Sequence, residues 1–385
     1  MKSPKKKILF ITTTNINSSS ANANRAIALL NSLVDSGFDI TVVHATLNNQ
    51  LDHPKRNDVN FPIVFFADKS KSRVKNLFLL FYVMFKTLNF IRKNKQALIY
   101  SYGFHVFDVV ISSLSKLFFR TPVIREFTEH PSYNNKIGVL TKIKIKIAFH
   151  FSNHILVISK NLKDFVATYT KKPISILNMV VDAERFNIKT QNTGNLISYC
   201  GTIESEKDGI FSLFKAFQLF MQNDRFKEFK LQIIADTRNK VKYNNLVHLA
   251  TQLGILESII FTGKVASSEM PSYLSNSKLL VLSRDKNQQA KYGFPTKLGE
   301  YIASGVPTLC TDVGNISEFI TDEVNGFIVE PNSPKIFADK MVSIIDNYQH
   351  SKEIASIGQK LLLKEFNPNE QAKTIIEAID QIAQD

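Results

Sequence analysis

The sequence has 385 residues, of which 44% are hydrophobic and 21% are charged. This length is enough for two domains, and the composition is that of a soluble protein with sizeable cores. The two cysteines, Cys200 and Cys310, lie in apolar runs typical of strands. We therefore expect two buried thiols in a reducing compartment rather than a disulfide.

The net charge of +14 is unevenly distributed along the chain. Residues 1–185 carry 27 basic and 11 acidic residues, whereas residues 186–385 carry 21 and 23. Such an excess in one half indicates an anionic partner, either nucleic acid or an acidic membrane surface. A solvated basic surface without a partner is the alternative. Because the sequence has no recognisable nucleic-acid-binding motif, we expect no nucleic-acid partner.

The start of the chain is basic, like a signal peptide, but its apolar run at residues 8–11 is too short for one. The longest apolar run, residues 77–85, is interrupted by Lys86 and falls short of the ~20 residues that span a bilayer. We therefore expect a cytoplasmic protein that is not integral to a membrane.

Strands and helices alternate through the first half. Apolar runs predict strands at 7–11, 39–44, 59–66, 98–101, 122–127 and 155–158. Helical periodicity predicts helices at 23–36, 74–94, 107–119 and 161–169, the last capped by Ser159. This alternation implies an α/β fold with a parallel, doubly wound sheet.

Residues 136–151 (KIGVLTKIKIKIAFHF) are basic and apolar together. Lys142, Lys144 and Lys146 alternate with isoleucines, and a period of two formally predicts a strand with one charged face. A basic amphipathic segment can also lie on an anionic membrane surface. A solvated face is the alternative.

A hinge at 174–189 and a polar linker at 190–195 separate this region from a second β-α series. Strands are predicted at 196–199, 230–235, 259–262 and 278–283, and helices at 210–221, 244–253, 268–275, 335–348, 351–364 and 367–383. Two doubly wound domains place their ligand sites at the carboxyl ends of the strands.

The most informative stretch is 292–331, YGFPTKLGEYIASGVPTLCTDVGNISEFITDEVNGFIVEP. It reads as loop, short helix, strand, loop, helix, turn and strand, with Pro295 at a helix start and Glu300 in the first turn. The N–H groups and dipole of a helix N-terminus suit a phosphate. A carboxylate beside them can accept hydrogen bonds from sugar hydroxyls.

This stretch resembles the donor-nucleotide motif of glycosyltransferase family 4, the group 1 glycosyltransferases of the GT-B superfamily. The second Glu of that motif corresponds to Glu300, and Ala303-x-Gly305-x-Pro307 and Asn325-Gly326 also match. A related subgroup carries a Pro-Thr-Lys-Leu-x-Glu-Tyr string, which residues 295–301 match. The hinge is similar to the family hinge at Asn178, Asp182 and Phe186.

The resemblance implies two Rossmann-like domains that face each other across a cleft. We expect an acceptor-side domain at 1–188, a nucleotide-sugar-binding domain at 189–366, and a terminal helix at 367–385 that crosses back to the first domain.

The resemblance also assigns the donor site. Glu300 would hold the ribose hydroxyls, and Lys207, in a string similar to the family's Gly-Arg-Leu-x-x-x-Lys-Gly, would meet the diphosphate. Arg284 ends a strand and meets either a phosphate or solvent. The full set of expected substrate-binding residues is Gly201, Thr202, Lys207, Arg284, Tyr292, Gly293, Phe294, Pro295, Thr296, Lys297, Leu298 and Glu300.

Two positions depart from the family pattern. Thr202 stands where the family has an Arg, and Tyr292 stands where it has the first Glu. Lys297 can replace the missing cation, so we expect the diphosphate cation beside Glu300 rather than in the Gly201 loop. The alternative is that Lys207 and Lys297 are ordinary surface lysines.

In the first domain the family places a His near the transferred sugar. His130 is the nearest histidine, and with Glu129 and Lys207 it completes the expected catalytic set; a loop histidine without a role is the alternative. No metal-ligand spacing of His, Cys, Asp or Glu is visible, and no Asp-x-Asp element follows a strand. We therefore expect no metal and no cofactor.

The sequence thus predicts a retaining, metal-independent glycosyltransferase. It would move a sugar from a nucleotide-diphosphate sugar to a lipid-linked or surface-polysaccharide acceptor, in lipopolysaccharide, O-antigen or capsule biosynthesis. A nucleotide-sugar 2-epimerase of the same fold and a non-catalytic sugar-nucleotide-binding partner are the alternatives. The basic first domain leaves open peripheral attachment to the inner face of the cell membrane.

Overall fold

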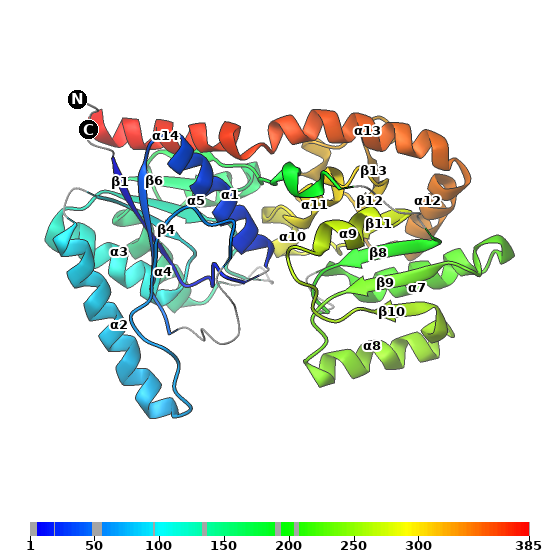
Figure 1. The fold of residues 1–385 in the computed structure, drawn as a ribbon, viewed down its shortest axis with the longest axis horizontal. Helices are drawn as coiled ribbons and strands as arrows, with labels where there is room; N and C mark the ends of the chain where they lie inside the picture. The colour runs from blue at the N-terminus through cyan, green and yellow to red at the C-terminus, as the bar shows by residue number, and fades with distance from the viewer. Residues whose placement is uncertain are drawn as a thin grey trace. The chain divides into compact units, whose positions relative to one another are not determined.

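The computed structural model describes residues 6–18, 20–47, 56–94, 97–132, 137–188, 194–203 and 208–384. The chain forms two compact units (Figure 1). The first unit comprises Met1–Val180 and Pro368–Asp385, and the second comprises Val181–Asn367. Residues 181–188, which we expected in the first domain, therefore belong to the second unit.

The first unit is built on a seven-stranded parallel sheet in the order β3-β2-β1-β4-β5-β6-β7. Its strands are β1 Lys7–Thr12, β2 Asp39–His44, β3 Ile63–Val64, β4 Leu98–Tyr102, β5 Val123–Phe127, β6 His154–Val157 and β7 Ile174–Ile176. The strand predicted at 59–66 is reduced to two residues, and β7 lies in the segment that we interpreted as hinge.

Both faces of this sheet are covered by helices, as a parallel sheet requires. Alternate residues of β1 point to opposite sides: Ile8 and Phe10 join the core against α1 and α14, whereas Leu9 and Ile11 join the core that contains residues of α2 and α3. The helices are α1 Ala21–Asp35, α2 Arg73–Lys93, α3 Val106–Phe119, α4 Val139–His150, α5 Lys160–Ala167 and α14 Pro368–Gln384. The terminal helix α14 packs along α1 within this unit.

The strand interpretation of the Lys-Ile repeat was wrong, because α4 is a helix. Ile145, Ala148 and Phe149 form its buried stripe at helical spacing, so a period of two along the sequence does not become two faces. Lys142 and Lys146 are exposed one turn apart, while Lys144 is half-buried and donates to the carbonyl of Phe104 at 3.0 Å.

The second unit has a six-stranded parallel sheet in the order β10-β9-β8-β11-β12-β13. Its strands are β8 Leu196–Cys200, β9 Lys230–Ile234, β10 Ile259–Phe261, β11 Leu279–Leu282, β12 Thr308–Thr311 and β13 Phe327–Val329. Its helices include α7 Ile210–Met221, α8 Lys240–Gln252, α9 Met270–Ser275, α10 Gln288–Tyr292, α11 Lys297–Ala303, α12 Pro334–Asp346 and α13 Tyr348–Glu365. Cys200 and Cys310 are buried and free, as predicted.

Both sheets follow the order of a doubly wound fold, with the first strand of each unit near the centre and the chain winding outward to both sides. The predicted α/β fold with two Rossmann-like domains is therefore confirmed. In such sheets the strand order reverses between the first and fourth strands, and ligands bind at the carboxyl ends of the strands there.

Candidate functional site

In the second unit the strand order reverses between β8 and β11, which pair with each other. The residues that follow these strands are Gly201 and Thr202 after β8, and Ser283 and Arg284 after β11. The topology alone therefore selects this end of the sheet as a binding site. Gly201, Thr202 and Arg284 of the expected donor set lie at this reversal, and Lys297 of the same set lies beside it.

Three of those residues converge on one buried carboxylate, Asp208. Lys297 Nζ donates to Asp208 Oδ2 at 2.8 Å, and Arg284 Nε lies 3.7 Å from Asp208 Oδ1. The main-chain N–H and the hydroxyl of Thr202 lie 3.3 and 3.2 Å from Asp208 Oδ2. The sequence placed Thr202, Arg284 and Lys297 in one site, but it gave no role to the acid that joins them.

The pKa of Asp208 reflects the charges beside it. Burial by itself would raise the pKa of Asp208, but the Lys297 and Arg284 cations outweigh burial and hold that pKa well below its ordinary value. Asp208 is therefore ionised at neutral pH and faces both Lys297 and Arg284. The side chain of Lys297 remains 21% exposed, and an ammonium has three donors, so it can bind an anionic ligand while it contacts Asp208.

Two glycines allow this packing. An added Cβ at Gly201 would lie 2.0 Å from the hydroxyl oxygen of Tyr199, which donates to the carbonyl of Thr202 at 2.8 Å. Gly209 has φ +63°, and its Cβ would lie 1.9 Å from the carbonyl oxygen of Ser283. Any side chain at position 201 would overlap the ring of Tyr199, so glycine is required there even before a ligand is considered. Gly209 lets α7 begin against the end of β11.

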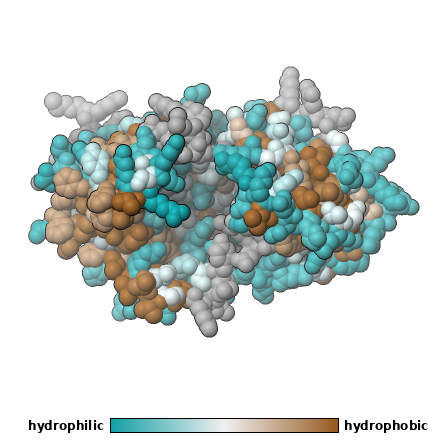
Figure 2. Space-filling model, turned by 90° about the horizontal axis from the view of Figure 1, so that it is seen from below, coloured by the Kyte–Doolittle hydropathy of each residue, from teal (hydrophilic) through white to brown (hydrophobic). Residues whose placement is uncertain are grey.

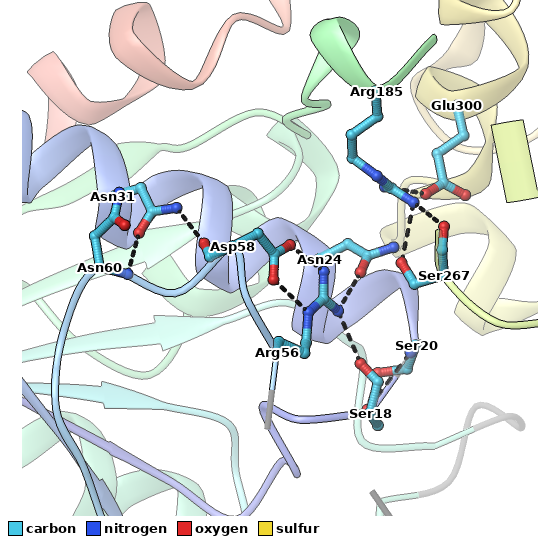
Figure 3. Close-up of polar contacts among 10 residues, drawn as sticks. All are labelled: Ser18, Ser20, Asn24, Asn31, Arg56, Asp58, Asn60, Arg185, Ser267 and Glu300. Atoms are coloured by element: carbon cyan, nitrogen blue, oxygen red, sulfur yellow. Dashed lines mark hydrogen bonds and ion pairs between the residues drawn. The ribbon is translucent and has the colours of Figure 1, made fainter. Parts of the chain in front are cut away.

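Glu300 lies one turn after Lys297 on α11 and is held by Arg185. Arg185 Nη1 donates to Glu300 Oε1 at 3.1 Å, and Arg185 Nη2 donates to the carbonyl and hydroxyl of Ser267 at 2.6 and 3.0 Å (Figure 3). Arg185 belongs to a short 3-10 helix, Ala183–Phe186, within the segment that we interpreted as the hinge. Both side chains are largely buried, so this ion pair fixes the direction of the carboxylate.

The rest of the motif is divided between surface and interior. Tyr292 ends α10 and is half-buried, Gly293 caps that helix, and Thr296 precedes α11. Pro295 and Leu298 are buried, and Phe294 packs edge-on against Phe319 and Phe366. The side chains of these three residues serve the core, so any donor contact at Phe294, Pro295 or Leu298 is restricted to the main chain.

The N-terminus of α11 is a weaker binding site for an anion than the sequence suggested. The helix α11 has seven residues, and the N–H of Leu298 already donates to the carbonyl of Pro295 at 2.9 Å. Lys207, expected in both the catalytic and the donor sets, lies outside the described residues.

The first unit holds the remaining candidates. His130 follows β5, is 5% exposed and packs edge-on against Phe165. Its Nδ1 lies 2.9 Å from the carbonyl oxygen of Ser132, so it donates there in the tautomer that carries the proton on Nδ1. Glu129 is exposed beside it. The two side chains adjoin in sequence but differ in environment.

The strand order of the first unit reverses between β1 and β4, and a buried acid lies there too. Asp108 Oδ2 accepts from the Thr13 hydroxyl at 3.2 Å and from the His105 N–H at 3.3 Å, which caps α3. Burial raises the pKa of Asp108 to about 7, against the opposing charges of Arg125 and Lys144. This acid therefore titrates near neutral pH.

The loop after β1 is held by a side chain from the segment before β3. Arg56 Nη1 donates to the carbonyl of Ser18 at 3.0 Å and to Asn24 Oδ1 at 2.7 Å, while its other nitrogens pair with Asp58 (Figure 3). The hydroxyl of Ser20 caps α1 by accepting from the N–H of Ala23. The serines and asparagines thus order the loop without glycine.

Sequence reasoning missed two residues, Asp208 and Arg185. Asp208 follows Lys207 directly, and Arg185 precedes the matched Phe186, so both lay inside the quoted motifs. The available signal for Asp208 was an acidic residue directly after Lys207, in the string that we expected to bind the diphosphate. No group of three or more His, Cys, Asp or Glu side chains that could hold a metal ion occurs in the part of the chain that the structure describes.

Comparison with known proteins agrees with this geometry. Residues 180–361 match the family model for glycosyl transferases group 1. An uncharacterised glycosyltransferase of Methanocaldococcus jannaschii is 23% identical over 248 residues, which cover 59% of this chain and 67% of the relative.

Solved structures share the whole fold. A glycosyltransferase from Rickettsia africae superposes with a TM-score of 0.76 at 16% identity, covering 100% of both chains. The Anabaena protein HepE, solved in complex with UDP and glucose, superposes with a TM-score of 0.77 at 15% identity, covering 98% of this chain and 100% of HepE.

The fold and these matches define the class: a two-domain enzyme of the GT-B fold. The second unit is a group 1 glycosyltransferase domain, and the chain is a glycosyltransferase.

Proposed function

We propose that the second unit binds a nucleotide-diphosphate sugar at the carboxyl ends of β8 and β11, and that the enzyme transfers the sugar with retention of configuration, as a member of family 4. The observation that carries this proposal is the convergence of Thr202, Arg284 and Lys297 on Asp208 at the reversal of strand order. These residues lie at the end of the sheet where doubly wound folds generally bind ligands, which supports the proposal.

Each residue has a separate part in the proposal. Lys297 meets the diphosphate and stabilises the negative charge that develops on it as the sugar departs. Asp208 is a positioning residue, because its carboxylate orients Lys297 and Arg284. Glu300, aligned by Arg185, accepts hydrogen bonds from the ribose hydroxyls. The phenol of Tyr292 contacts the sugar by a hydrogen bond or by stacking.

The acceptor is proposed to bind the first unit, where the excess of basic residues favours an anionic glycan or a lipid-linked saccharide. His130 is the proposed contact to the transferred sugar. Transfer is proposed to proceed without a divalent metal, since cationic side chains supply the charge that a metal would supply.

A ligand screen tests the donor proposal. Purified protein is heated with UDP, GDP, ADP and their sugars, each with and without EDTA. A ligand present at 100 times its Kd stabilises the folded state by about 2.7 kcal/mol and raises the melting temperature. We expect one nucleotide to do so, equally well with EDTA. If none does, the donor site is wrong; if EDTA removes the shift, metal independence is wrong.

A second assay separates transfer from its rivals. Donor turnover that requires an added acceptor supports a transferase, whereas turnover of the donor alone to an isomeric nucleotide-sugar indicates a 2-epimerase. Donor binding without any turnover indicates a non-catalytic partner.

A further inference from the structure

The helix α2 presents a broad apolar face to solvent. Six of its large apolar side chains are between 45% and 70% exposed: Val74, Leu77, Phe78, Phe81, Tyr82 and Phe85. Since each helical residue turns the direction by about 100°, these six positions fall on one side of the helix. Soluble monomers rarely expose contiguous apolar surface of this kind without a partner.

The opposite side of α2 belongs to the fold. Val83, Thr87 and Ile91 are buried at four-residue spacing, and Ile91 joins the core beneath the sheet with Ile111 of α3. One side of α2 is therefore buried in the core of the first unit, and the opposite side is exposed to solvent. Among the described residues α2 is the one helix with the length and mean hydropathy of a membrane span. Its buried stripe instead ties it to the domain.

Neighbouring helices extend the apolar surface. The helix α3 packs against both α2 and α4, and its last turn exposes Leu117 and Phe118. On α4 the exposed apolar residues are Val139, Leu140, Ile143 and Ile147. Figure 2 shows hydrophobic atoms gathered on the side of the first unit that bears these helices. We call the exposed residues of α2, the end of α3 and α4 the α2–α4 face.

The exposed charges on α2 and α4 are of one sign. Arg73, Lys75, Arg92 and Lys93 are exposed at the two ends of α2, and Lys142 and Lys146 are exposed on α4. Neither α2 nor α4 contains an acidic residue. An exposed apolar surface whose helices carry only basic charges complements a bilayer with anionic headgroups, in which apolar side chains enter the acyl boundary and basic ones stay among the phosphates.

From this we propose that the α2–α4 face docks the protein on an anionic lipid bilayer, with α2 lying in the plane of the interface. A second copy of the chain is a poorer occupant, because it would bring two sets of exposed cations together. The inference stands apart from donor binding and is measured without donor or acceptor, so either proposal can fail alone.

Vesicle flotation tests the inference. Full-length protein is mixed with vesicles of phosphatidylcholine, or of equal parts phosphatidylcholine and phosphatidylglycerol, at low and high salt. The test variant carries Phe78→Ser and Phe85→Ser, both exposed positions whose change leaves the core intact. The control is Val241→Ser, an equally exposed apolar residue on α8. A third variant carries Lys142→Glu and Lys146→Glu.

We expect wild type and Val241→Ser to float with the phosphatidylglycerol vesicles and less with pure phosphatidylcholine. The Phe78 and Phe85 changes should lower the partition coefficient at least tenfold, and the lysine changes should abolish the preference for anionic lipid. No flotation of wild type, or unchanged flotation of the phenylalanine variant, overturns the proposal. So does a concentration-dependent dimer that the phenylalanine changes dissolve.

Discussion

Lys297 Nζ donates to Asp208 Oδ2 at 2.8 Å, although the two residues are 89 positions apart in the sequence. They meet at the carboxyl ends of the strands of the second sheet. The pair links the first turn of α11 to the start of α7, and it shares its carboxylate with Arg284 and Thr202. The acid holds the lysine in place before any ligand arrives. A side chain of high rotamer entropy is thereby positioned, which lowers the cost of binding an anion.

Replacing Lys297 by Met tests its proposed contact with the diphosphate. A hydrogen bond from a charged group contributes about 1.5–3 kcal/mol, so donor affinity should fall roughly tenfold to a hundredfold. Calorimetric titration measures the loss. Lys286→Met, an exposed lysine after β11, is the control and should leave affinity unchanged. Equal affinities for wild type and Lys297→Met would remove Lys297 from the site.

Asp208→Asn should change the dependence of stability on pH. The folded-state pKa of Asp208 is depressed, so its contribution to stability is complete above the unfolded value of about 3.9 and disappears as the pH falls further. At neutral pH the variant should lose about 3 kcal/mol, because Lys297 and Arg284 lose their counter-charge.

Urea unfolding at a series of pH values measures this difference. The gap between the wild-type and Asp208→Asn curves should narrow as the pH falls below about 3.9, because the unfolded carboxylate then takes up a proton while the folded one stays ionised. Asp236→Asn, which breaks an exposed pair with Arg238, is the control and should cost less than about 1 kcal/mol. A constant gap across the whole pH range would contradict the charge account.

The first unit contains a buried ion pair of Arg25 on α1 with Glu126 on β5, and Tyr100 donates to the same carboxylate. Arg25 also donates to the carbonyls of Leu177 and Asn178 at 3.3 and 3.2 Å. Glu126→Ala leaves a buried cation unpaired and should cost about 3–5 kcal/mol. Adding Arg25→Met should recover part of that loss, as a double-mutant cycle of denaturation measurements would show. Additive losses would mean that the two residues act independently.

Gly209→Ala should disrupt the second unit through steric overlap rather than backbone strain. Gly209 and Gly263 both have positive φ, but only Gly209 has an atom within contact of its missing Cβ. Gly263→Ala should therefore cost about 1–2 kcal/mol, the ordinary penalty for a left-handed residue. Gly209→Ala should cost more and weaken nucleotide binding; equal melting temperatures for the two variants would contradict this.

The sequence predicted most elements because their signals are local. The helix at Ile210–Met221 and the strand at Asp39–His44 match their predicted bounds, since apolar spacing and capping residues lie within each element. The Lys-Ile period of α4 misled because Lys144 donates to the carbonyl of Phe104 while Lys142 and Lys146 are exposed to solvent. A local sequence pattern does not show which face of a helix a neighbouring element covers.

The same reason explains the missing parts of the site. Glu300 was found through a family motif, but its partner Arg185 lies 115 residues away. The helix α2 was predicted correctly in length, yet its exposed face follows from the absence of a covering element among the described residues. Contacts over long sequence separations depend on the completed fold.

In the proposed donor complex, Glu300 anchors the nucleotide in the second unit. Calorimetric titration of wild type, Glu300→Gln, Arg185→Met and the exposed control Glu330→Gln with the nucleotide selected by the thermal screen tests it most directly. We predict at least tenfold weaker binding for Glu300→Gln, a smaller loss for Arg185→Met, which keeps the carboxylate but frees its direction, and none for Glu330→Gln. Unchanged affinity in Glu300→Gln, with its fold intact by circular dichroism, would contradict the account.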